Sequence, residues 1–139
     1  MSHTATGRRA AAAPAIVTAL RVLAVLTVVV IVWQFVTAGP LVEHTQAYET
    51  AEGLHGTGAV VLHVVSGLTM IAAALRWRSG AALWPTIVAA LVFVLSFLQA
   101  YLGSYGPISV HVPGAMVLTI GAVLVAAWSF TRAAGGGRT

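Results

Sequence analysis

The chain has no cysteine, no lysine and very little charge. The missing cysteines exclude disulfides, thiolate metal sites, iron–sulfur clusters and covalently attached c-type haem. Charged residues make up only 7% of the 139 residues, whereas hydrophobic residues make up 59% and the mean hydropathy is +0.95. A soluble domain needs a charged, wettable exterior, so this composition excludes one. We therefore expect an integral membrane protein whose main partner is the lipid bilayer.

The few charges that are present are strongly basic, with a pI near 10.8. In a membrane protein this basic charge indicates topology and contact with anionic lipid, and we expect no nucleic-acid partner. The bias towards Ala, Val, Gly and Arg without any lysine suggests a GC-rich gene of the kind found in actinobacteria. The sequence thus predicts a multi-pass protein of a bacterial inner (plasma) membrane.

Four apolar stretches are long enough to cross roughly 30 Å of hydrocarbon. They cover residues 16–38, 55–75, 82–102 and 108–130 within a membrane domain at 15–132. Their short connections predict an all-α, antiparallel four-helix bundle. Residues 1–14 are predicted to form a disordered tail and residues 133–139 a flexible one.

The first connection is predicted to be the longest. Gly39 and Pro40 are expected to end the first span and to leave residues 39–54 as an outer loop that contains His44. The role of His44 and of this loop stays open at this point.

Acidic and basic residues lie in different connections. All three acids fall in one outer connection, as Glu43, Glu49 and Glu52. Six arginines fall on the other side, namely Arg8, Arg9, Arg76, Arg78, Arg132 and Arg138. The positive-inside rule then predicts that both termini are cytoplasmic.

Two histidines open spans that run in the same direction. His55 begins the second span and His111 begins the fourth, so both are expected at one depth near the outer face. Coordinating side chains in a bilayer are costly and usually mark a site. Two imidazoles from different helices can supply both axial ligands of a b-type haem iron. Because headgroups and water also reach such residues, the pair alone leaves haem and no cofactor equally open.

Three other polar residues could support this pair. Glu52 precedes His55 by three residues, and it could orient the ring or accept a proton. His63 lies about 12 Å deeper, where the fourth span offers no histidine, so a core hydrogen bond is favoured over a ligand or proton-transfer role. Gln99 is a buried amide that either bonds to another helix or contacts the cofactor.

These residues resemble one half of the heme A synthase family. Glu52 and His55 match the Glu-x-x-His at the start of that family's second span, and residues 98–103 followed by His111 resemble its glutamine–glycine stretch before the fourth-span histidine. The resemblance covers residues 16–130. It implies haem bound by His55 and His111, and it supports haem binding more than the family's oxidation of a haem methyl group. In the haem hypothesis, His63 and Gln99 help to bind the cofactor, Glu52 is the catalytic group, and the activity is electron transfer or haem modification.

The chain also departs from that family. Gly56 stands where members commonly have a basic residue, the outer-loop cysteines are absent, and only one half is present. A homodimer or a partner subunit would be needed to restore two halves. The competing hypotheses are a haem-free accessory subunit of a larger respiratory complex and a small transporter, and the lack of a broken central span argues against the latter.

Overall fold

The computed structural model describes residues 4–135, and these residues form helices and short connections without any strand. Four of the helices are long and apolar enough to cross a membrane. This confirms the predicted all-α fold with four membrane helices. In chain order, the helices are α1 (Thr4–Glu43), α2 (Tyr48–Arg78), α3 (Trp84–Tyr105), α4 (Ile108–Ser129) and the short α5 (Arg132–Gly135).

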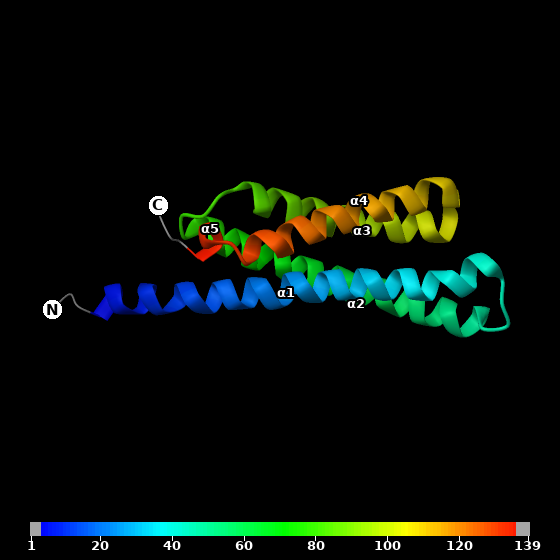
Figure 1. The fold of residues 1–139 in the computed structure, drawn as a ribbon, viewed down its shortest axis with the longest axis horizontal. Helices are drawn as coiled ribbons and strands as arrows, with labels where there is room; N and C mark the ends of the chain where they lie inside the picture. The colour runs from blue at the N-terminus through cyan, green and yellow to red at the C-terminus, as the bar shows by residue number, and fades with distance from the viewer. Residues whose placement is uncertain (1–3, 136–139) are drawn as a thin grey trace.

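The four long helices form an antiparallel bundle (Figure 1). Short connections force each helix to fold back along the one before it, which gives two hairpins, α1–α2 and α3–α4. Helix α1 contacts α2 and α4, and α3 also contacts α2 and α4. Helices α2 and α4, which carry the two predicted ligands, therefore stand at diagonal corners and run in the same direction.

The first connection is much shorter than predicted, because Gly39 and Pro40 do not end the first helix. Helix α1 continues to Glu43, and His44 then takes a left-handed φ of 50°. A proline so near a helix end costs little, since only one carbonyl loses its donor. The Thr45 N–H donates to the Pro40 carbonyl at 3.2 Å and completes the turn.

The expected outer loop at 39–54 is consequently reduced to residues 44–47. Helix α2 starts at Tyr48, so Glu49 and Glu52 lie on a helix and not in a loop. The tails differ as well. Residues 4–14, expected in a disordered tail, belong to α1, and α5 takes the start of the expected flexible tail. Residues 1–3 and 136–139 lie outside the described residues.

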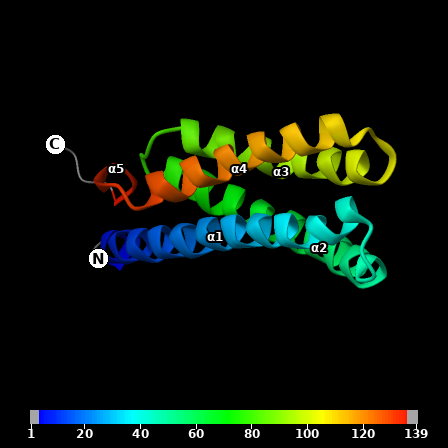
Figure 2. The ribbon, with the colours of Figure 1, turned by 45° about the vertical axis from the view of Figure 1, so that its right-hand side comes forward.

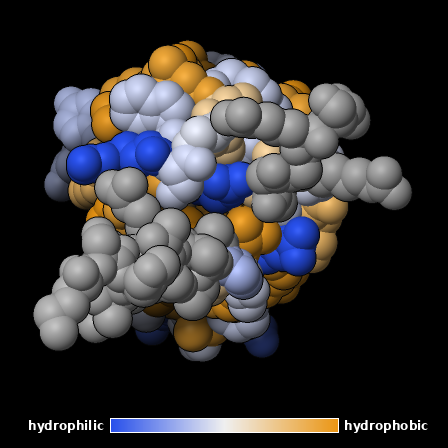
Figure 3. All heavy atoms as spheres, turned by 90° about the vertical axis from the view of Figure 1, so that its left-hand side faces the viewer, coloured by the Kyte–Doolittle hydropathy of each residue, from blue (hydrophilic) through white to orange (hydrophobic). Residues whose placement is uncertain are grey.

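Arginines stabilise the end of the bundle that carries the termini. The Arg21 Nε donates to the Ser129 carbonyl at 2.9 Å, and the guanidinium lies 5.3 Å from the centre of the Phe130 ring. The buried Arg76 donates from Nε to the Ala134 carbonyl. Cations at helix C-termini are favourable because they meet the negative end of the helix dipole. Figure 3 looks onto this end and shows hydrophilic areas between hydrophobic ones.

The pattern of buried and exposed positions in the first hairpin recurs in the second. One constant spacing relates α1 to α3, pairing Ala24 with Ala89, and another relates α2 to α4, pairing Leu62 with Leu118. Both members of each of these pairs are buried. The bundle therefore has an approximate twofold axis that runs along its length between the hairpins.

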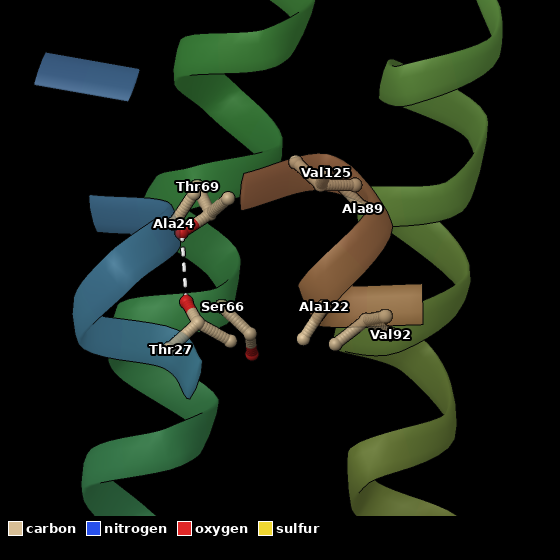
Figure 4. A pocket seen from close by; sticks show the side chains of 8 residues that line it. All are labelled: Ala24, Thr27, Ser66, Thr69, Ala89, Val92, Ala122 and Val125. Atoms are coloured by element: carbon tan, nitrogen blue, oxygen red, sulfur yellow. Dashed lines mark hydrogen bonds between the residues drawn. The ribbon is translucent and has the colours of Figure 1, made fainter. Parts of the chain in front are cut away.

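A small cavity lies on this axis, lined by matched positions from all four helices (Figure 4). The volume of this cavity is about 10 Å³, which is roughly the space that one water molecule needs. Thr27 and Thr69 share a 2.9 Å hydrogen bond across α1 and α2 at this level. The lining pairs are Ala24 with Ala89, Thr27 with Val92, Ser66 with Ala122, and Thr69 with Val125.

The shared core stops short of the end opposite the termini. Its two hydrophobic clusters reach only as far as Ile31, Leu62 and Leu118. Beyond this level, no residue in 97–117, the stretch that ends α3 and begins α4, is buried. The hairpins diverge towards this end in both ribbon views (Figures 1 and 2). Hydrophobic packing thus joins the hairpins over only part of their length.

Candidate functional site

His55 and His111 lie at the end of the bundle where the shared core has stopped. Both are half-buried. The spacing that pairs Leu62 with Leu118 also pairs His55 with His111, so the two rings occupy matching positions on diagonal helices. The sequence prediction that they share one level is consistent with this arrangement.

The His55 ring is held by α1. Its Nδ1 lies 3.0 Å from the Thr37 hydroxyl oxygen, and that hydroxyl also lies 3.1 Å from the Trp33 carbonyl and 3.2 Å from the Gln34 carbonyl. A carbonyl only accepts, so the hydroxyl can donate to it and accept from an Nδ1–H. In this arrangement the Thr37 hydroxyl hydrogen and the His55 Nδ1 hydrogen each have an acceptor. The lone pair of the His55 Nε2 is then available to bind a metal.

The His111 ring is held by packing on α3. A Cβ added to Gly103 would lie 3.0 Å from the His111 Cε1, so the ring occupies space that only glycine leaves free. The Nδ1 of His111 is buried and has no hydrogen-bond partner. An unpartnered buried polar atom costs free energy, and such an atom in a native fold calls for a ligand, a water or another explanation.

Two glutamines repeat the same pattern. Gln34 on α1 and Gln99 on α3 are matched positions, and both carry a buried Oε1 without a partner. Each amide fills the space above a glycine of its own hairpin. A Cβ on Gly58 would lie 2.6 Å from the Gln34 Oε1, and a Cβ on Gly114 would collide with the Gln99 amide nitrogen.

Taken together, all four membrane helices contribute a polar side chain to this level. Three buried atoms there lack a partner, namely the Oε1 atoms of Gln34 and Gln99 and the Nδ1 of His111. Within the described part of the chain, no cluster of three or more His, Cys, Asp or Glu side chains could hold a metal ion. A haem needs only two protein nitrogens, because its porphyrin supplies the other four. The two histidines would be enough protein ligands for a haem.

The remaining predicted site residues lie outside this group. Glu52 is exposed on α2 one turn before His55, whose Nδ1 partner is Thr37. His63 is half-buried deeper along α2 and stacks on Phe97 with ring centres 4.0 Å apart. It lines a groove between α2 and α3, and its Nε2 has no partner. His44 is exposed in the first connection, where it stacks on Tyr48.

Sequence reasoning did not single out Thr37 or Gln34. Helical threonines are common in membrane spans, so nothing in the local sequence distinguishes Thr37. Gln34 does have a signal, because the spacing that separates it from Gln99 also separates Ala24 from Ala89. A search for a repeat between the two halves of the chain would have found it.

No family model, no curated protein and no solved structure matches the chain. The resemblance to heme A synthase accordingly stays a hypothesis that rests on the residues quoted for it. The site must be interpreted from its own chemistry.

Proposed function

We propose that this protein binds a b-type haem between α2 and α4, with His55 and His111 as the two axial ligands. The observation that carries the proposal is the pair itself. Two imidazoles occupy matched positions on the diagonal helices α2 and α4, at the level where the shared hydrophobic core has ended. Polar side chains in hydrocarbon cost free energy, and within membrane helices they usually mark a functional site.

Two further features support a large planar ligand. The hydrophobic clusters that join the two hairpins end before this level, so a ligand here would not have to displace a shared buried core. The unpartnered Oε1 atoms of Gln34 and Gln99 would give it polar contacts. Haem supplies one-electron redox chemistry when bound, and the protein tunes it through ligation and the polarity of its surroundings.

The distribution of charge supports a position in the outer half of the membrane. Arg21, Arg76 and Arg78 lie at the end that carries the termini, and Glu43, Glu49 and Glu52 lie at the opposite end. The positive-inside rule then gives cytoplasmic termini. The histidine pair would lie towards the outer face, with the exposed Glu52 at the membrane surface as a proton acceptor.

The activity we propose is electron transfer or haem modification, as the resemblance to one half of heme A synthase implies. A homodimer would supply a second four-helix half. In either case, His55 and His111 would hold the cofactor, and Gln34 and Gln99 are the polar residues that the other two helices would offer it.

Haem titration of the purified protein tests this assignment. The protein is prepared without haem in detergent or nanodiscs and titrated with hemin, and the absorbance and the visible spectrum are followed. We expect stoichiometric binding with a low-spin, six-coordinate spectrum. The His55→Ala/His111→Ala variant should lose it, because the iron then has no protein nitrogen at this level.

His63→Ala and His44→Ala serve as matched controls, since each removes one imidazole outside the pair. Both should retain the low-spin spectrum. If the wild-type chain binds no haem, or if the double variant keeps the spectrum, the proposal is wrong. A colourless chain that copurifies with a respiratory complex at fixed stoichiometry would support the accessory-subunit alternative instead.

A further inference from the structure

His55 and His111 occupy matched positions in the two hairpins, but different neighbouring residues hold the two rings. We infer that the two imidazoles are unequal, and that Thr37 is the positioning residue that presents the Nε2 lone pair of His55 to the iron. This inference rests on the proposed haem site and deepens it. The juxtaposition that carries it is the Thr37 hydroxyl 3.0 Å from the His55 Nδ1.

The hydrogen bonds of Thr37 favour the Nδ1–H tautomer of His55. Thr37 is almost fully buried, with 5% of its surface exposed, and its hydroxyl reaches a carbonyl one turn back on α1. With that hydrogen donated to the carbonyl, the oxygen accepts the Nδ1–H of His55. Metal-bound histidines usually have such a partner on the second nitrogen, which fixes both the tautomer and the ring orientation.

The matching position on α3 has no equivalent group. The spacing that pairs Gln34 with Gln99 pairs Thr37 with Leu102, and the residue that the His111 ring packs on is Gly103. Neither residue has a side chain that can accept a hydrogen bond. The buried Nδ1 of His111 is accordingly left without a partner.

This difference has a chemical consequence. The His55 ring is oriented before any ligand binds, so its side chain loses little conformational entropy on binding. The His111 ring is oriented only by its packing on a glycine, and its tautomer is not fixed. His55 is therefore the firmer ligand of the pair, and His111 is the one that an added small ligand replaces.

The tautomer can be measured without haem. ¹⁵N NMR of the haem-free protein, labelled at histidine, distinguishes Nδ1–H from Nε2–H, and a His55→Ala sample assigns the signal. We expect the Nδ1–H form in the wild type and in Thr37→Ser, which keeps the hydroxyl. Thr37→Val keeps the shape but removes the acceptor, and it should lose the preference. Thr57→Val on the exposed face of α2 is the matched control and should change nothing.

Hemin titration of the same variants gives the second readout. Loss of a supporting partner typically weakens metal binding by roughly 10–100-fold, so Thr37→Val should weaken haem binding by this factor and Thr37→Ser should restore it. An Nε2–H form of His55 in the wild type, or unchanged binding in Thr37→Val, would overturn the inference. If no variant and no wild-type sample binds haem, the proposed function fails, while the NMR result still decides the role of Thr37.

Discussion

The two hairpins share one geometry but differ in polarity. The buried Ser96 of α3 matches Ile31 of α1, but at four other matched positions α1 or α2 carries a hydroxyl group and α3 or α4 carries hydrocarbon. The pairs that differ in this way are Thr27 with Val92, Thr37 with Leu102, Ser66 with Ala122, and Thr69 with Val125. His55 matches His111 and Gln34 matches Gln99, so these polar side chains recur in both hairpins. This contrast separates residues that hold one hairpin together from residues that we propose form a site shared by both.

The hydroxyl groups of the first hairpin are satisfied within it. Thr27 and Thr69 bond to each other, Ser66 donates to the Leu62 carbonyl at 2.6 Å, and Thr37 holds His55. Hydrogen bonds between membrane helices are each worth about 0.6 kcal/mol on average. The second hairpin relies on close packing instead, with Gly114 and Gly121 set against side chains of α3.

The largest effect is expected from removing each histidine singly. His55→Ala and His111→Ala should both abolish the six-coordinate spectrum, because each leaves the iron with one protein nitrogen. His55→Ala should lose more haem than His111→Ala, since it removes the ring that is already oriented. Hemin affinity measured side by side tests this order. Equal losses would contradict the inequality of the pair but not the haem site.

A smaller effect is expected from filling the space under His111. In Gly103→Ala, the new methyl group would lie 3.0 Å from the ring carbon, so the ring must turn. We expect a shifted haem spectrum and weaker binding, with a loss in unfolding free energy of about 1–3 kcal/mol, as is typical of overpacking. Spectroscopy and denaturation of the purified variant provide the measurement.

Gly53→Ala is the control for that experiment, because a Cβ at Gly53 meets nothing within 4 Å. It should leave the spectrum unchanged, and it should not lower the stability, because alanine is the better helix former at this exposed position. A Gly103→Ala protein with an unaltered spectrum would show that the His111 ring does not depend on its packing against α3.

The smallest effect on stability is expected at the central cavity, where Thr27 of the first hairpin matches Val92 of the second. Thr27→Val removes the Thr27–Thr69 hydrogen bond and should destabilise the bundle by about 0.6 kcal/mol. The reciprocal change, Val92→Thr, should cost less, because the new hydroxyl can donate to the carbonyl one turn back on α3. Unfolding measurements in mixed detergent compare the two. A larger loss for Val92→Thr would contradict the assigned difference between the hairpins.

Much of the fold could be predicted from the sequence, because span length and hydropathy are set by the thickness of the bilayer. The errors lie at the first connection, where turn-forming residues are weak evidence at the membrane surface. Gly39 and Pro40 usually end helices, yet α1 continues to Glu43. Proline and glycine are tolerated in membrane helices when the backbone finds other partners.

The site could be predicted only in part. His55 and His111 stand out because polar groups are rare in such spans, and the structure places them at matched positions. Which side chain supports each ring depends on contacts between helices that sequence spacing does not specify. The i−3 position favours Glu52 as the partner of His55, but the partner of its Nδ1 is Thr37 on a different helix.

The most direct test of haem ligation by His55 and His111 is a reduced-minus-oxidised visible spectrum of the purified chain, combined with a pyridine-haemochrome assay. The expected result is a b-type haem with a low-spin spectrum in the wild type and its loss in the His55→Ala/His111→Ala variant. A well-folded wild-type protein without haem absorbance, or a double variant that keeps the wild-type spectrum, would contradict it.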